Sequence, residues 1–297
     1  WALWLSIRLW GKPSLINAGS LALILGFQLQ RAHAQIAYYT WLLIGLYFLI
    51  MIIYSLIEKN EKLIISKKLL FILMACILGI GISALIYIPA IEYTPFSVRG
   101  GSSSGGSDYN YATGWSFHPY EILTFLIPSS FGFGGQVYWG YMPFTDYPNY
   151  MGIIILGLSL IGMVYKKGIF KWYLLSATIL ALFISFGRHF SLVYNLFFNF
   201  FPYFDKFRVP HMILILVQFN IAIFAAFGID KILQSKNRSL PKWFYPSISP
   251  FVVFLLSLVF ASNSIKRFLM ERFTVPRTSD PSQIQAVNSI RWDLWIY

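Results

Sequence analysis

Long apolar runs separated by short polar segments dominate the pattern of this chain. Seven runs hold about 18 or more mostly apolar residues, enough for a helix to cross the hydrocarbon core of a bilayer. The pattern therefore predicts an all-α fold, a polytopic transmembrane helix bundle over residues 1–262 with about seven spans. The predicted spans are 13–31, 36–57, 68–91, 148–165, 170–187, 209–231 and 244–262.

Composition favours the same class of protein. Of the 297 residues, 57% are hydrophobic and 11% are charged, which is too little polar surface for a water-soluble globule of this size. The lone Cys76 gives neither a disulfide framework nor a CxxC motif. Small residues recur at every fourth position in the first and third spans and predict close helix packing; they are Ala18, Ala22 and Gly26, and Ala75, Gly79 and Ser83.

The net charge of +12 is distributed unevenly along the chain. Alternate threading of the seven spans places 13 Lys and Arg against three acids on one side, and ten against eight on the other. Basic residues in short loops mark the cytoplasmic face, so the loop 92–147 and the tail 263–297 are predicted to be extracytoplasmic. The basicity therefore reflects topology, and no nucleic-acid partner is predicted.

The predicted outer segments are of several kinds. Within the loop 92–147, GGSSSGGS is a low-complexity stretch, whereas PYEILTFLIPSSFG predicts a short interfacial helix, as does FSLVYNLFFNFF before the sixth span. The polar tail 263–297 is expected to begin a soluble domain that is incomplete here. The chain opens without Met and ends abruptly, so it is expected to be an internal fragment.

A charged cluster stands at the start of the sixth span, in FPYFDKFRVPHM. Asp205, Lys206, Arg208 and His211 precede a long apolar run. A solvated membrane anchor is one interpretation, because basic side chains at helix ends commonly reach to the interface. The other interpretation is an anion site, because a helix N-terminus and a guanidinium fork together suit a phosphate at headgroup depth.

Other chemistry is poorly supported by the residue pattern. The four histidines have no ligand spacing, so no metal site is predicted; they are His33, His118, His189 and His211. Neither a phosphate-binding glycine loop after a strand nor a GxSxG motif is present in the sequence, which disfavours nucleotide-driven and serine-hydrolase chemistry.

Several motifs resemble those of one family. FPYFDKFRVPHMILILVQFNIAIFAAFGIDKI resembles the P-x-F-x-x-F-R-x-P signature and following small-residue helix of YfhO-like bacterial membrane proteins. RAHAQIAYY, IPAIEYTPFSVRG, HPYEILTFLIPSSFG and DYPNYMGIIILGL follow the family order. The resemblance extends over nearly the whole chain, to about Ala261.

The resemblance implies a GT-C-type fold and a glycosyltransferase of the bacterial cytoplasmic membrane. Such an enzyme moves a sugar from a polyprenyl-phosphate donor to an envelope polymer or glycolipid acceptor on the extracytoplasmic face. By this analogy Arg208, Arg99 and His211 would bind the donor phosphate. The cavity-lining residues implied are His33, Gln35, His118 and Tyr150, with Glu92 near them.

The catalytic base is not identified by the resemblance, because the acidic motif of the superfamily would lie upstream of this chain. Glu92, Asp108 and Asp146 are outer carboxylates that could assist the acceptor or hold a divalent cation. Two further functions stay open, a transporter of lipid-linked sugars or polymers and a non-catalytic scaffold of an envelope-assembly complex.

Overall fold

The computed structural model describes most of the chain up to residue 234. The described residues are 1–31, 33–58, 62–96, 108–128, 130–131, 138, 140–142 and 149–234, with scattered positions from 245 to 264. Arg99 and Asp146 lie outside them, as do the tail 263–297 except residue 264 and most of the predicted span 244–262.

The described part of the chain is helical, and the predicted all-α class is confirmed there. The longer helices are α1 (Ala2–Gly11), α2 (Leu15–Gln30), α3 (Ala34–Ile57), α4 (Lys62–Tyr93), α6 (Ile153–Tyr165), α7 (Ile169–Ser185), α8 (Ser191–Phe200) and α9 (Leu214–Leu233). The shorter elements are α5 (Tyr109–Ala112) and the 3-10 turns η1 (Thr94–Phe96), η2 (Pro119–Phe125), η4 (Gly187–Phe190), η5 (Phe204–Lys206) and η6 (Pro210–Ile213).

Three described helical segments are long and apolar enough to cross a bilayer. They are Ala34–Ile57, Ile64–Phe96 and Pro210–Leu233, and a fourth results if Ile169–Ser185 and Gly187–Phe200, bent by 112°, form one span. Apolar side chains along α4 are exposed, as expected of a surface that faces lipid; examples are Leu70, Leu73, Ile77 and Leu85. These features are consistent with a helical membrane protein.

The predicted spans 13–31 and 148–165 correspond to helices that are shorter than expected. α2 has 16 residues and α6 has 13, so α6 rises only about 20 Å against a hydrocarbon core of about 30 Å. Residues near the ends of these helices explain why they are short. The Ser14 side chain caps α2 by accepting from the Asn17 backbone N–H, and Gly152 and Gly168, both with φ of 90°, flank α6.

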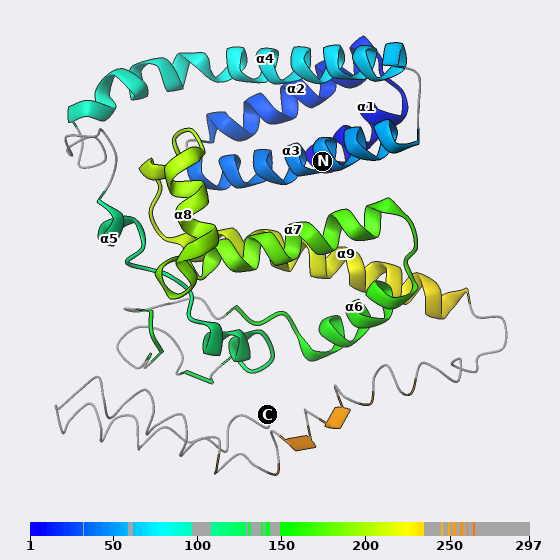
Figure 1. The fold of residues 1–297 in the computed structure, drawn as a ribbon, viewed down its shortest axis with the longest axis vertical. Helices are drawn as coiled ribbons and strands as arrows, with labels where there is room; N and C mark the ends of the chain where they lie inside the picture. The colour runs from blue at the N-terminus through cyan, green and yellow to red at the C-terminus, as the bar shows by residue number, and fades with distance from the viewer. Residues whose placement is uncertain are drawn as a thin grey trace.

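The long helices lie side by side, with α2, α3 and α4 in one group and α6, α7 and α9 in another (Figure 1). The C-terminal ends of α3, α6 and α9 lie at one end of the bundle, together with the N-terminal ends of α4 and α7. The helices α5 and α8 lie at the opposite end (Figure 1). Successive long helices thus run in alternating directions, as the threading of the apolar pattern predicts.

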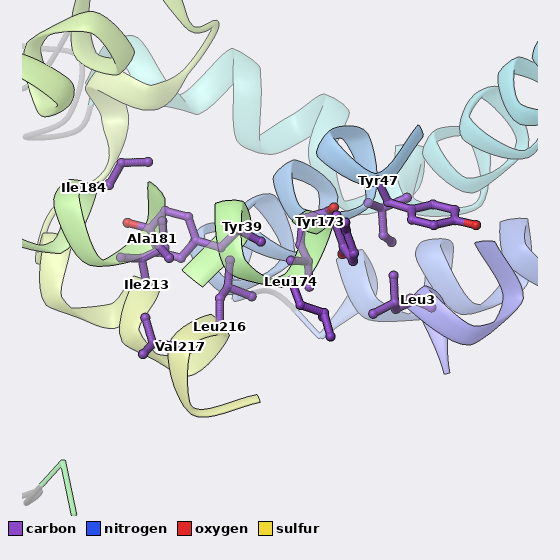
Figure 2. Close-up of a cluster of buried hydrophobic side chains, with 14 of the residues drawn as sticks. Leu3, Tyr39, Tyr47, Tyr173, Leu174, Ala181, Ile184, Ile213, Leu216 and Val217 are labelled. Carbon is purple, nitrogen blue, oxygen red and sulfur yellow. The ribbon is translucent and has the colours of Figure 1, made fainter. Parts of the chain in front are cut away.

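The two groups of helices meet through buried apolar side chains of α3, α7 and α9 (Figure 2). Tyr173 of α7 packs edge-on against Tyr47 of α3, with 5.3 Å between ring centroids. The Tyr173 hydroxyl also donates to the carbonyl oxygen of Leu43 at 3.2 Å. A buried phenol thus keeps its hydrogen bond inside an otherwise apolar contact.

Glycines allow close approach within each group of helices. A Cβ atom at Gly162 of α6 would collide with the carbonyl oxygen of Phe224 in α9, and one at Gly228 of α9 would collide with the carbonyl oxygen of Leu158. A Cβ atom at Gly79 of α4 would lie 3.2 Å from the Leu25 Cβ of α2. The small-residue packing predicted for the first and third spans is therefore confirmed for α2 and α4.

The segment between α5 and η2 is hydrogen-bonded to the last residue of α7 and to η4, which follows it. The Phe117 N–H donates to the carbonyl oxygen of Ser185 at 2.9 Å, and the Arg188 N–H donates to the Ser116 hydroxyl at 3.1 Å. A Cβ atom at Gly187, whose φ is 47°, would collide with that hydroxyl. These contacts hold α5 at the bundle end where α9 begins.

Candidate anion-binding site

Arg208 lies between η5 and η6, and its guanidinium contacts two aromatic rings. The guanidinium carbon is 4.3 Å from the ring centroid of Tyr111 and 3.8 Å from that of Trp115. One terminal nitrogen donates to the Tyr111 hydroxyl at 3.1 Å. Both rings belong to the segment around α5, so two parts of the chain nearly 100 residues apart make this arrangement.

The positive charge of Arg208 has no carboxylate partner within 4.0 Å among the described residues. The nearby carboxylate of Asp205 pairs instead with Lys206, at 3.1 Å. The Arg208 Nε is buried and has no hydrogen-bond partner in the described part of the chain. A guanidinium carries five N–H donors, and the described residues accept from one of them, at the Tyr111 hydroxyl.

The backbone beside Arg208 is held in an unusual conformation. Val209 has φ of 64° and ψ of 71°, a left-handed conformation that is a genuine outlier for a β-branched residue. Its carbonyl oxygen accepts a 3.1 Å hydrogen bond from Gln35 Nε2, which also contacts the Tyr39 hydroxyl at 2.8 Å. The surrounding structure therefore fixes the backbone from which the Arg208 side chain extends.

The first turn of α3 holds the same loop at a second point. The Tyr38 hydroxyl donates to the carbonyl oxygen of Pro202 at 3.0 Å. The Tyr38 ring also meets Phe207 edge-on, with centroids 4.9 Å apart. Gln35 and Tyr38 thus attach α3 to both ends of the segment 202–209.

Asp108 has a structural task at the start of α5. Its carboxylate accepts from the backbone N–H groups of Asn110 and Tyr111, at 3.1 and 3.4 Å. This is an N-cap, which satisfies donors that a helix start leaves unpaired. The side chain proposed as a carboxylate for catalysis therefore orients the turn that carries Tyr111.

His211 makes contacts that differ from those of Arg208. Its Nε2 lies 2.8 to 3.0 Å from the side-chain amide of Asn149, and its ring centroid is 5.7 Å from that of Phe117. No described hydrogen bond joins His211 to Arg208. The other predicted phosphate ligand, Arg99, lies outside the described residues.

Glu121 is a buried carboxylate that the sequence reasoning missed. It accepts from the Tyr138 hydroxyl at 2.6 Å, from the Met142 N–H at 3.2 Å and from the His118 N–H at 2.9 Å. Burial raises its pKa above the ordinary value, while these hydrogen bonds act in the opposite direction. The sequence signal for this residue was the string HPYE, in which His118 caps the start of η2 and Glu121 follows three residues later, as in a capping box.

An aromatic cluster surrounds His118. Its ring stacks on Tyr141 with centroids 3.8 Å apart and meets His189 edge-on at 4.6 Å. Two of the four histidines are thus neighbours. The described residues contain no group of three or more His, Cys, Asp or Glu side chains placed to hold a metal ion.

The remaining predicted site residues do not gather around Arg208. His33, Glu92 and Tyr150 are exposed, at the start of α3, near the end of α4 and before α6. Gln35 is buried and bonded to the Val209 carbonyl. Tyr111 and Trp115, which do contact Arg208, were not predicted, although aromatic residues four positions apart in YNYATGW were a signal.

The chain matches no protein-family model, no curated protein and no solved structure. A guanidinium that has no counter-ion among the described residues, contacts two aromatic rings and extends from a constrained backbone is suited to bind an oxyanion.

Proposed function

We propose that this chain is part of a membrane glycosyltransferase that binds a polyprenyl-phosphate-linked sugar and transfers the sugar to an envelope acceptor. The observation that carries the proposal is the Arg208 guanidinium, which contacts the rings of Tyr111 and Trp115 and has no carboxylate partner among the described residues. The site would face the extracytoplasmic side of the bacterial cytoplasmic membrane, where the donor headgroup and the acceptor meet.

The ligand chemistry follows from the geometry of the guanidinium. A planar guanidinium can donate two parallel hydrogen bonds to two oxygens of a phosphate in a fixed geometry, whereas a lysine ammonium acts as a point charge. Because Arg208 directly precedes η6 and α9, the span Pro210–Leu233, a phosphate on it would lie at the mouth of a long apolar helix. A lipid phosphate has its polar group at this depth and its chain in the hydrocarbon.

The same guanidinium would contribute to the transfer step. The sugar–phosphate bond breaks with development of negative charge on the departing phosphate, which a fixed cation stabilises. The acceptor hydroxyl gives up its proton to a general base as its oxygen bonds to the anomeric carbon, and the departing phosphate keeps the electron pair of the broken bond. Glu121 is an unsuitable base because its carboxylate already accepts three hydrogen bonds, and Asp108 is engaged as a helix cap.

A transporter of lipid-linked sugars is the second candidate, and one observation favours it. Asn220 in α9 is fully buried, and neither atom of its amide group has a partner among the described residues. A polar side chain within a membrane helix often marks a substrate pathway. Asn220→Leu should abolish movement of a fluorescent lipid-linked sugar across proteoliposomes if the chain is a transporter, and should leave sugar transfer intact if it is the proposed enzyme.

The test of the enzyme uses full-length protein in proteoliposomes with a radiolabelled polyprenyl-phosphate sugar. Arg208→Lys keeps the charge and loses the fork, whereas Arg208→Ala loses both. Loss of a charge-assisted contact of about 1.5 to 3 kcal/mol predicts a tenfold to hundredfold fall in transfer for the alanine variant, with the lysine variant between.

Arg188→Ala is the matched control for Arg208→Ala, because Arg188 is an exposed arginine in η4. Its transfer rate should equal that of the unaltered protein. Equal transfer by folded Arg208→Ala and Arg188→Ala proteins would exclude the phosphate site at Arg208.

A further inference from the structure

The end of the bundle opposite α5 and α8 holds the C-terminal ends of α6 and α9 and the N-terminal ends of α4 and α7 (Figure 1). A second group of cations belongs to the residues in and next to these helix ends and the end of α1. None of them has a carboxylate within 4.0 Å among the described residues; they are Arg8, Lys12, Lys67, Lys68, Lys166, Lys167, Lys171 and Lys231. The two described acids here have neutral partners, since Glu58 accepts from the Tyr54 hydroxyl and Asp230 accepts from Gln234 at 2.7 Å.

Two of these lysines form a reciprocal arrangement between α6 and α9. The Lys166 ammonium at the end of α6 lies 4.0 Å from the ring centroid of Phe227 in α9. The Lys231 ammonium of α9 lies 5.2 Å from the ring centroid of Tyr165 in α6. Each helix thus places a cation on an aromatic ring of the other, and the Gly162 and Gly228 contacts bring the two backbones close together.

The described residues position these two ammonium groups on aromatic rings, and none of their carboxylates pairs with either group. Aromatic faces and the C-terminal ends of helices attract cations, yet they supply only partial negative charge. Asp230, the neighbour of Lys231, is bonded to Gln234. None of the described residues supplies a full negative charge to either lysine, whereas lipid phosphates carry one at the depth where membrane helices end.

We propose that Lys166 and Lys231, at the junction of α6 and α9, bind the headgroup of an anionic phospholipid. Basic sites between transmembrane helices bind such headgroups, and each lysine near the surface contributes attraction to them. This site is independent of Arg208, which lies in the segment before α9 begins, and the proposal does not rest on the sugar-transfer function.

The test uses the full chain in nanodiscs of phosphatidylcholine with rising fractions of phosphatidylglycerol. Native mass spectrometry counts the phosphatidylglycerol retained by the protein. The Lys166→Gln/Lys231→Gln double variant should bind this lipid about thirtyfold more weakly, and the Lys166→Arg/Lys231→Arg double variant should bind it as the unaltered protein does.

The matched control is Arg31→Gln/Arg188→Gln, which removes two exposed cations from the other end of the bundle. Its lipid retention should not change. Equal retention by the two glutamine double variants would overturn the proposal. Inorganic phosphate is added to phosphatidylcholine nanodiscs as a separate arm, and if it raises the melting temperature as much as phosphatidylglycerol does, the ligand is free phosphate and the lipid site is excluded.

Discussion

Gln35 donates a 3.1 Å hydrogen bond to the carbonyl oxygen of Val209, a residue 174 positions further along the chain. This bond connects the first turn of α3 with the loop that carries Arg208. The buried Gln35 amide thereby finds an acceptor, and the carbonyl oxygen of the left-handed Val209 finds a donor. The geometry of the candidate anion site therefore depends on a helix far away in sequence.

Gln35→Leu should loosen the loop 202–209. The substitution removes the donor to the Val209 carbonyl and leaves that group without its partner, at a cost of about 1 to 2 kcal/mol. Limited trypsin cleavage after Lys206 and Arg208 should then be about fivefold to thirtyfold faster. Gln28→Leu breaks a similar bond to Thr40 away from this loop and serves as the control. Equal cleavage rates in the two variants would show that Gln35 does not hold the loop.

Val209→Gly should stabilise the protein by relieving backbone strain. A left-handed residue with a side chain costs about 1 to 2 kcal/mol, and Val209 has φ of 64°. Glycine adopts this conformation freely but gains entropy in the unfolded chain, so we expect a net gain of about 0.5 kcal/mol in the free energy of unfolding. Val209→Ala, which retains a Cβ, should give no gain. A lower free energy of unfolding for the glycine variant would contradict the strain argument.

Trp115→Leu should weaken binding of the polyprenyl-phosphate donor. The substitution removes the ring that lies 3.8 Å from the Arg208 guanidinium, an interaction of about 0.5 to 2 kcal/mol. Donor affinity, measured by titration of the purified protein, should fall about twofold to thirtyfold. Trp172→Leu removes an exposed tryptophan that contacts Lys171 and should leave donor affinity unchanged. Unaltered affinity in the Trp115 variant would mean that the ring does not position Arg208 for the donor.

Glu121→Gln should change how stability depends on pH. Burial raises the pKa of Glu121 in the folded protein above 4.5, the ordinary value that it keeps in the unfolded chain. At a pH between the ordinary pKa and the raised pKa, the folded protein therefore holds a proton that the unfolded chain releases. This carboxyl group therefore contributes stability at low pH that is lost as the pH rises through its raised pKa. The free energy of unfolding, measured from pH 4 upward, should show a smaller decline in Glu121→Gln. Glu92→Gln, which alters an exposed carboxylate, should retain the decline of the unaltered protein. An unchanged decline in the Glu121 variant would refute the assignment.

Gly162→Ala should separate α6 from α9. The added methyl group would meet the Phe224 carbonyl oxygen, which belongs to the backbone and cannot rotate away, so a loss of about 1 to 3 kcal/mol in the free energy of unfolding is expected. Gly45→Ala is the matched helical control, because no atom lies within 4 Å of its added Cβ, and it should stabilise slightly. Equal effects of the two substitutions would show that close contact at Gly162 is unimportant.

The sequence predicted two of the long helices within their observed bounds, but it did not predict the bend after α7. Residues 36–57 and 68–91 were predicted as helices, and α3 and α4 contain them, because a continuous apolar run fixes helix type and length together. The predicted span 170–187 instead ends at Ser185, after which the chain turns by 112° into α8. The bend depends on Gly187, which has a positive φ and packs on Ser116, a residue of a different segment.

The sequence by itself determined the helical class, the positions of the longest apolar helices and the unusual charge at Arg208, because these follow from local composition and periodicity. Only the tertiary structure decided which groups surround that charge. Tyr111 and Trp115 reach Arg208, and Gln35 reaches Val209, through contacts between segments distant in the chain. Local patterns contain no information on such pairings, since they arise when helices pack and fasten the loops between them.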